Sequence, residues 1–280
     1  MTKARKILSL ALALGMMLSL SVTAMAITAD DFNKGNLSGI AMTKEGDGYL
    51  VTDTFNKVVW LVKGETTSQY AGKIGVADTT GEPMGVYQDG AVDKAYFIEP
   101  WDIAQFVNGY AVSDAGAKVI RYIDDGRVYT IEDTNNKLSF ERPTGLTTDN
   151  LGNLYISDTE KGEVFMMDRD GHVSSVATGL TSPTGIVWYQ KTLYVAETGR
   201  SRIVKIDEAG KVTALAGVSD DDGDGEYFGG YVDGSAETAR FDHPQGITAS
   251  NGALYISDTG NNAVRMYKSG RDNLKISYIT

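Results

Sequence analysis

The chain contains no cysteine and few residues of several other chemically specialised types. Its 280 residues include two histidines, five prolines and three tryptophans. Without cysteine there is no disulfide framework, no thiolate metal site and no cysteine nucleophile. Two histidines cannot form a three-histidine zinc site, and the Gly-x-Ser-x-Gly sequence of a hydrolase nucleophile elbow is missing. The sequence therefore lacks the usual signatures of thiol, zinc and serine catalysis.

Basic residues are outnumbered by acidic ones. The chain has 26 Lys and Arg against 37 Asp and Glu, which gives a formal net charge of -11. Binding to nucleic acid depends on clustered Lys and Arg that neutralise phosphates, and docking on anionic lipid needs similar clusters. We therefore expect neither a nucleic-acid partner nor a lipid surface. With 42% hydrophobic residues and 32 glycines, the composition is that of a globular protein rich in tight turns.

The only long apolar run lies at the N-terminus. A short basic segment precedes an apolar stretch from Ile7 to about Val22, and Ala-Met-Ala at 24–26 offers small residues for cleavage. A membrane anchor is the alternative, but the apolar core is short and interrupted by serines. The sequence predicts a signal peptide over 1–26 and a mature domain over 27–280. A cysteine-free exported protein fits an extracytoplasmic, secreted location at a bacterial cell envelope, with no membrane span after signal cleavage.

Five segments of the mature chain repeat one order of signals. Each has short alternating runs rich in Val, Ile and Tyr, separated by Gly, Asn and Asp, and none keeps a helical period. In the third segment we expect strands at about 144–148, 153–157, 163–167 and 172–177. Four antiparallel strands in a repeat of about 40 residues are typical of a β-propeller blade. The predicted fold class is therefore all-β, a β-propeller of four-stranded antiparallel blades.

The repeats resemble the NHL-repeat family of β-propellers. The matching features are Pro-x-Gly-Ile in the first strand, Leu-Tyr-Ile/Val-x-Asp-Thr in the second, and Asn-x-x-Val or Arg-Ile in the third. They cover nearly all of residues 37–280. Family members commonly have six blades, whereas five repeats are counted here, the last ending near Lys275–Tyr278, so the expectation is five or six blades. The resemblance is specific for fold and weak for function, because one fold hosts many sites.

One acidic residue follows the second strand of every repeat. These residues are Asp53, Asp114, Asp158, Glu197 and Asp258. Because each precedes a tight turn, we interpret them as structural acceptors of backbone N–H groups. Glu197 fits this role less well, and its segment 196–203 (AETGRSRI) is similar to strictosidine-synthase-like and gluconolactonase-like propellers, in which a glutamate near the channel does chemistry. That resemblance implies an alternative, a divalent-metal-assisted hydrolase that uses Glu197 together with Asp102.

Two insertions, 73–99 and 218–243, lengthen the connections that precede the second and fifth repeats. Near their ends, Asp89-Gly90, Ala95, Phe97 and Pro100 align without gaps with Asp233-Gly234, Ala239, Phe241 and Pro244. We expect the Ala and Phe to pack beneath each loop and the Asp-Gly to turn it. Antiparallel strands place the insertions at the same end of a blade as the turns after the repeated acids. We predict this loop-rich end to be the binding face, because function concentrates in loops.

The candidate ligand-binding residues at the loop-rich end are Trp101, Arg142, Arg200, His243, Gln245, Tyr87 and Tyr231. Packing and solvated surface is the alternative interpretation for all of them. The second insertion also holds Asp220, Asp222 and Asp224, the alternation that begins a Ca²⁺-binding loop. Its twelfth position is Tyr231 instead of a bidentate Glu, so a solvated acidic loop is the favoured interpretation. Calcium is the only cofactor that the sequence suggests.

These observations favour a non-enzymatic module. The sequence predicts a secreted binding or scaffold propeller that presents its loop-rich face to a protein, peptide or glycan partner at the cell envelope. The metal-assisted hydrolase is the alternative, and a module of an envelope assembly with no ligand of its own is a third. Convergence of two or more carboxylates on one point would favour the hydrolase.

Overall fold

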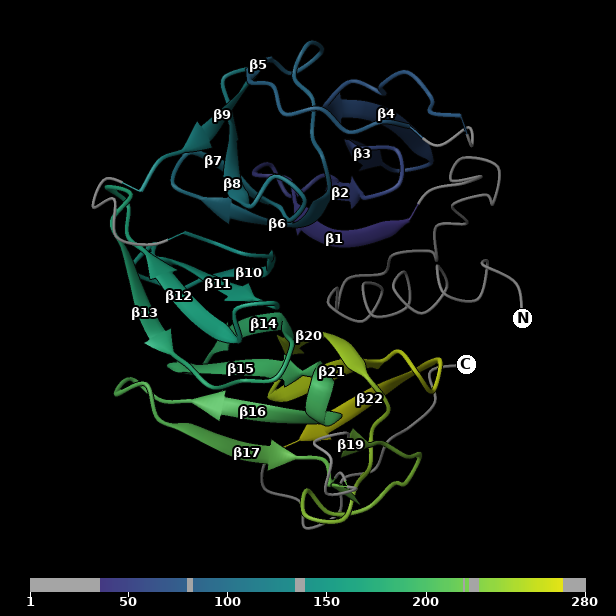
Figure 1. Cartoon of the computed structure of the whole chain (residues 1–280), viewed down its shortest axis with the longest axis vertical. Helices are drawn as coiled ribbons and strands as arrows, with labels where there is room; N and C mark the ends of the chain where they lie inside the picture. The colour runs from purple at the N-terminus through teal and green to yellow at the C-terminus, as the bar shows by residue number, and fades with distance from the viewer. Residues whose placement is uncertain (1–35, 80–82, 134–138, 219, 222–226, 269–280) are drawn as a thin grey trace. The chain divides into compact units, whose positions relative to one another are not determined.

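The structure, a computed structural model, describes residues 36–79, 83–133, 139–218, 220–221 and 227–268. Their regular structure is almost entirely β-strand, with one short 3₁₀ helix, η1 (Thr198–Arg200). The strands form five antiparallel blades of a β-propeller, which confirms the predicted fold class (Figure 1). The predicted signal peptide at 1–26 lies outside the described residues. Within the described ranges, no helix is long and apolar enough to cross a bilayer.

The blades belong to two compact units. The N-terminal unit comprises the described residues of 25–161 together with 165–174, and the C-terminal unit comprises 162–164 and the described residues from 175 onward. The first two blades lie in the N-terminal unit and the last two in the C-terminal unit. The boundary passes through the outer strands of the third blade.

Blades 1 to 3 follow the chain order of their strands. Blade 1 contains β1 (Leu37–Met42), β2 (Tyr49–Asp53), β3 (Val58–Lys63) and β4 (Thr66–Ala71). Blade 2 contains β6 (Pro100–Phe106), β7 (Gly109–Asp114), β8 (Val119–Asp124) and β9 (Arg127–Ile131), and β5 (Gly90–Ala91) of the first insertion pairs with β9 as a fifth strand. Blade 3 contains β10 (Pro143–Thr148), β11 (Leu154–Asp158), β12 (Glu163–Met167) and β13 (Val173–Ala177), close to the predicted bounds.

Blades 4 and 5 repeat this pattern. Blade 4 contains β14 (Pro183–Tyr189), β15 (Thr192–Glu197), β16 (Arg202–Ile206) and β17 (Val212–Ala216). The described strands of blade 5 are β20 (Pro244–Ser250), β21 (Ala253–Asp258) and β22 (Ala263–Lys268). The strand predicted near Lys275–Tyr278 lies outside the described residues. The second insertion contributes a two-stranded ribbon of β18 (Asp220–Asp221) and β19 (Tyr227–Phe228).

Within each unit, the first strands of neighbouring blades lie against one another. β1 contacts β6 and β6 contacts β10, while β14 contacts β20. A Cβ atom at Gly39 would overlap the backbone of Asp102, and one at Gly185 would overlap the backbone of Gln245. Glycine is therefore required at these two places by the close approach of backbones.

The hydrophobic cores lie between blades. In the N-terminal unit, Leu50 of blade 1 and Ile103 of blade 2 belong to one cluster that also contains Ala95 and Phe97 of the first insertion. In the C-terminal unit, Phe241 of the second insertion packs with Ala196 of blade 4 and other buried residues. Both phenylalanines are fully buried, and burial of one such side chain contributes about 2–3 kcal/mol. The predicted apolar anchors beneath the insertions are confirmed.

Candidate binding site

The repeated acids at the loop-rich ends of the blades are fully buried and hold the turns that follow them. Asp53 accepts the backbone N–H of Asn36, ahead of its own β1, and that of Asn56 in its turn, at 3.1 and 3.0 Å. Asp158 accepts three backbone N–H groups in the same way, from residues 141, 142 and 161. These bonds confirm the structural interpretation. Each carboxylate accepts hydrogen bonds from backbone N–H groups that strand pairing does not use and that would otherwise need water as a partner.

Glu197 occupies the same place in blade 4 with different partners. Its Oε1 accepts the backbone N–H of Thr181 at 2.9 Å, as an aspartate does elsewhere. Its Oε2 accepts the Nε–H of Arg202 at 2.6 Å, and the Nε of Arg200 lies 3.6 Å from Oε1. The side chain is fully buried. The carboxylate thus accepts a hydrogen bond from Arg202 and forms a longer ion pair with Arg200, whereas the repeated aspartates of blades 2 and 5 each pair with a single arginine.

Each insertion is held by a buried arginine that the sequence analysis did not identify. In blade 2 the Arg121 guanidinium bonds to Asp114 at 3.2 Å and to Asp89 of the insertion at 2.6 Å. It also donates to two backbone carbonyls of the insertion. The rings of Tyr87 and Phe97 lie 5.0 and 5.1 Å from its central carbon. The guanidinium is therefore stacked between two aromatic rings while its Nη atoms join the loop to the blade.

Arg265 repeats this arrangement in blade 5. It bonds to Asp258 at 2.5 Å and to Asp233 at 2.9 Å, and its central carbon lies 5.0 and 5.1 Å from the rings of Tyr231 and Phe241. The rings of Tyr87 and Tyr231 therefore pack over buried arginines, although about half of each residue remains exposed. The signal that could have found both arginines is their identical separation from the acids and the tyrosines of the two insertions.

Two predicted site residues lie in contact in the N-terminal unit. The Arg142 guanidinium stacks on the Trp101 ring at 5.4 Å and bonds to Glu99 Oε1 at 2.6 Å. Trp101 is half-buried at the start of β6, and Arg142 directly precedes β10. The arrangement offers an aromatic and a cationic surface side by side at the loop-rich end of blades 2 and 3.

Three further predicted residues lie in the C-terminal unit. Arg200 stacks on the Tyr227 ring at 5.0 Å. His243 donates its backbone N–H to Ser201 Oγ at 3.2 Å, and its imidazole pairs with Asp242 at 2.5 Å. The His243 side chain is 62% exposed, and Gln245 is exposed at the start of β20. Arg200 and His243 are brought together through the neighbouring Ser201.

Asp102 stands where the other repeats have glycine, and it joins two blades. Its carboxylate accepts the backbone N–H of Ile103 and that of Leu146 in blade 3, both at 2.8 Å. Burial raises the pKa of Asp102 to about 7, although these two N–H groups act in the opposite direction. Both oxygens are occupied by the fold, so Asp102 acts as a blade connector.

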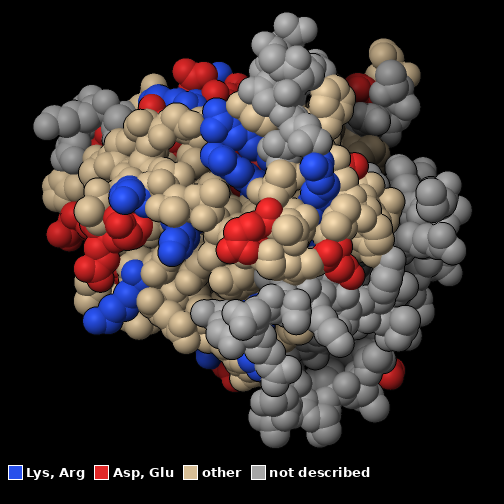
Figure 2. Space-filling model, turned by 90° about the horizontal axis from the view of Figure 1, so that it is seen from below, with Lys and Arg blue, Asp and Glu red and all other residues tan. Residues whose placement is uncertain are grey.

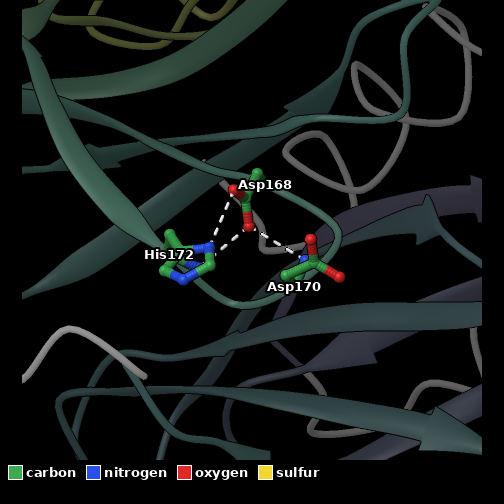
Figure 3. A group of neighbouring side chains, drawn as sticks. All are labelled: Asp168, Asp170 and His172. Carbon is green, nitrogen blue, oxygen red and sulfur yellow. Dashed lines mark hydrogen bonds and ion pairs between the residues drawn. The ribbon is translucent and has the colours of Figure 1, made fainter.

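A group of Asp168, Asp170 and His172 lies in the hairpin between β12 and β13 (Figure 3). Asp168 Oδ1 accepts the backbone N–H groups of Asp170 and His172, both at 2.9 Å. The N–H and then the imidazole of His172 lower the pKa of the Asp168 carboxyl. The corresponding Asp207 of blade 4 bonds to its own turn in the same way, without a histidine. The group is therefore a turn built by an aspartate.

The calcium prediction stays a prediction. Asp222 and Asp224 lie outside the described residues, and only the backbone of Asp220 is described, in β18. On the face drawn in Figure 2, acidic and basic side chains lie interspersed among uncharged residues instead of forming one patch of a single sign.

Comparisons with solved structures support the fold. The chain matches an auxiliary nutrient binding protein from Bacteroides thetaiotaomicron with a TM-score of 0.63 at 11% identity, covering 86% of this chain and 57% of that one. It matches a structure of the nidogen/laminin complex with a TM-score of 0.60 at 18% identity, over 84% and 76%. It also matches a catalytically inactive variant of virginiamycin B lyase from Staphylococcus aureus in complex with quinupristin. The TM-score is 0.58 at 16% identity, and the match covers 88% of this chain and 85% of that one. No family model and no curated protein matches the chain.

Proposed function

We propose that the chain is a secreted binding propeller of the NHL-repeat type. Its loop-rich end would bind a protein, peptide or glycan at the outer side of a bacterial cell envelope. The similar structures show the fold alone, yet one is described as a nutrient binding protein and another as a nidogen/laminin complex. The apolar run at the N-terminus supports export of the chain.

The main observation in favour of a binding function is that the repeated carboxylates stabilise the fold. All five are fully buried, and Asp53, Asp158 and Glu197 accept hydrogen bonds from their own blade or its arginines. A general acid or base needs a carboxyl group within reach of a substrate. By contrast, Trp101, His243 and Gln245 are accessible at the loop-rich ends. Recognition by side chains on loops fits this distribution better than carboxylate catalysis does.

The hydrolase alternative assigns Glu197 as the catalytic carboxylate. That role competes with its bonds to Thr181 and Arg202, and replacing either bond by a metal ion would leave a buried donor without a partner. Cation-dependent hydrolysis of gluconolactone by the mature chain, lost in Glu197→Gln with the fold retained, would establish the alternative. We expect no such turnover.

Capture experiments test the proposed binding face. The mature chain 27–280 is immobilised and offered envelope extract from the secreting organism and a defined glycan array. Trp101→Ala and His243→Asn are the loop-end variants; asparagine suits position 243 because the backbone there has a φ of 47°. Leu151→Ala is the control, since Leu151 is 75% exposed in the connection between β10 and β11, at the other end of its blade.

Both loop-end variants are expected to weaken retention of the captured ligand by about fivefold or more, which corresponds to a loss of about 1 kcal/mol of binding free energy. Leu151→Ala should retain it unchanged. Thermal melts establish that each variant is folded. Retention that survives both loop-end changes and falls in Leu151→Ala would place the binding surface at the opposite end.

A further inference from the structure

The position three residues after the repeated acid, at the loop-rich end, differs among the blades. In blades 1 and 5 this position holds Asn56 and Asn261, whose side-chain amides bond to Asp53 and Asp258. In blade 3 it holds Lys161, whose ammonium donates to the carbonyl of residue 139 at 2.7 Å. Blade 2 has alanine there. Blade 4 has Arg200 at this position, and the other four blades serve as internal comparisons for its surroundings.

The Arg200 guanidinium is held in place although not all of its hydrogen-bond donors have a partner among the described residues. One face lies on the Tyr227 ring at 5.0 Å, and Nε lies 3.6 Å from Glu197 Oε1, buried and without a hydrogen-bond partner among the described residues. The Arg200 side chain is 32% exposed. Among the described residues, none bonds to either Nη atom of Arg200. With respect to the described residues, the paired Nη donors of this planar guanidinium are therefore free to bind a carboxylate.

Arg202 adds a second guanidinium to the same carboxylate. Its Nε–H bonds to Glu197 Oε2 at 2.6 Å, and its side chain is 26% exposed. No partner for its Nη atoms occurs within the described part of the chain. Among the described residues, one buried carboxylate faces two arginines, so one of the two positive charges has no carboxylate of its own there. The carboxylate of Asp242, the residue before His243, lies 2.5 Å from the His243 imidazole.

A locally positive, donor-rich site is unusual on a chain whose net charge is -11. Its neighbours are polar: the exposed His243 is attached to Ser201, which lies between the two arginines in sequence. Imidazole and guanidinium groups can hydrogen-bond the hydroxyls and the acid group of a sugar. An acidic glycan fits these surroundings better than an apolar peptide does.

We propose that Arg200 and Arg202 bind the carboxylate of an acidic glycan at the loop-rich end of blade 4. This inference rests on the proposed binding function and names the chemistry of its ligand. Arg200 supplies the paired donors, Tyr227 fixes the plane of its guanidinium, and Glu197 binds the Nε–H of Arg202 and forms an ion pair with Arg200.

Titration calorimetry with a galacturonic acid oligosaccharide tests the proposal at about 0.15 M salt, where charges more than about 8 Å apart are largely screened. The mature chain should bind it, and a neutral galactose oligosaccharide of equal length should not bind. Arg200→Gln should weaken binding at least about tenfold, as expected for loss of a charge-assisted hydrogen-bonded pair. Lys161→Gln, the equivalent change in blade 3, should leave binding within twofold. Arg202→Gln is less suitable, because it leaves Glu197 buried beside a missing partner.

Equal binding by Arg200→Gln and the wild type would overturn the proposal, as would equal binding of the neutral oligosaccharide. Arg200-dependent binding of a glutamate peptide without binding of the glycan would overturn the glycan class. If the glycan binds only after Asp222→Asn and Asp224→Asn, the arginines are occupied by the chain's own acidic segment. That result would overturn the proposal that they bind an external ligand. If Trp101→Ala abolishes capture while Arg200→Gln does not, the proposed function stands and this inference fails.

Discussion

Arg121 and Arg265 are fully buried at equivalent places in blades 2 and 5, each stacked between a tyrosine and a phenylalanine of the insertion that precedes its blade. Each bonds to the repeated aspartate seven residues earlier and to the insertion's own aspartate 32 residues earlier. A buried charge is tolerated only when it is paired and hydrogen-bonded. The two insertions are therefore firmly attached to their blades at these points.

Removal of either arginine should destabilise the protein severely. Arg121→Met or Arg265→Met leaves a buried aspartate without its cation, and breaking a buried pair in this way costs about 3–5 kcal/mol. Lysine should not restore stability, because an ammonium lacks the planar pair of Nη groups that joins two carboxylates and two carbonyls. Urea unfolding measures the free energy of unfolding of each variant.

Arg127→Met is the matched control for Arg121→Met. Arg127 is exposed in β9, and its change should alter the free energy of unfolding by no more than about 0.5 kcal/mol. Equal stability of Arg121→Met and Arg127→Met would show that the buried pairs contribute nothing to the attachment of the insertion.

The pattern of strands and the apolar anchors could be predicted from the sequence because both are local signals. Alternating Val, Ile and Tyr define strands, and the matched Ala95 and Phe97 of the first insertion mark the residues buried beneath it. Trp101 and Arg142 were expected at one end, and they are in contact.

The attachment of the insertions by buried arginines could not be predicted from the sequence in the same way. Arg121 lies on a strand with ordinary alternation, and its role depends on Asp89 and Tyr87, which only the folded chain brings to it. Tyr87 stays a candidate ligand-binding residue, and its ring also stacks on Arg121. The strand β5 was also not expected, since Gly90–Ala91 has no strand-forming side chains and pairs only through its backbone with β9.

Asp102 should make stability depend on pH between about 4 and 7. Its pKa is about 7 in the folded protein and close to the usual 3.8 when unfolded, so in this range the folded chain holds a proton that the unfolded chain has lost. The stabilisation from the protonated carboxyl is complete below about pH 4 and is lost as the pH rises through 7. The limiting slope is about 1.4 kcal/mol per pH unit for one proton.

Asp102→Asn removes this proton. The free energy of unfolding of the wild type minus that of the variant should fall as the pH rises from about 4.5 to 7 and stay level above pH 8. Urea unfolding at several pH values measures it. Parallel profiles for the two proteins would contradict the assignment of a raised pKa to Asp102.

The C-terminal segment is expected to supply the fourth strand of blade 5, near Lys275–Tyr278. Deletion of residues 270–280 should then leave β22 (Ala263–Lys268) as an unpaired edge and reduce the hydrogen-exchange protection of its amides. Deletion of 279–280 alone is the control and should leave the protection unchanged. Undiminished protection of β22 after the longer deletion would exclude the segment as its partner.

Hydrogen exchange of the mature chain with and without its captured ligand tests the binding face most directly. The account predicts added protection in peptides of the loop-rich ends, at 99–101, 141–142, 198–203 and 241–245. It predicts none in the connections at 107–108 and 149–153, at the opposite ends of their blades. Protection confined to those opposite connections, with the loop-rich ends unchanged, would contradict it.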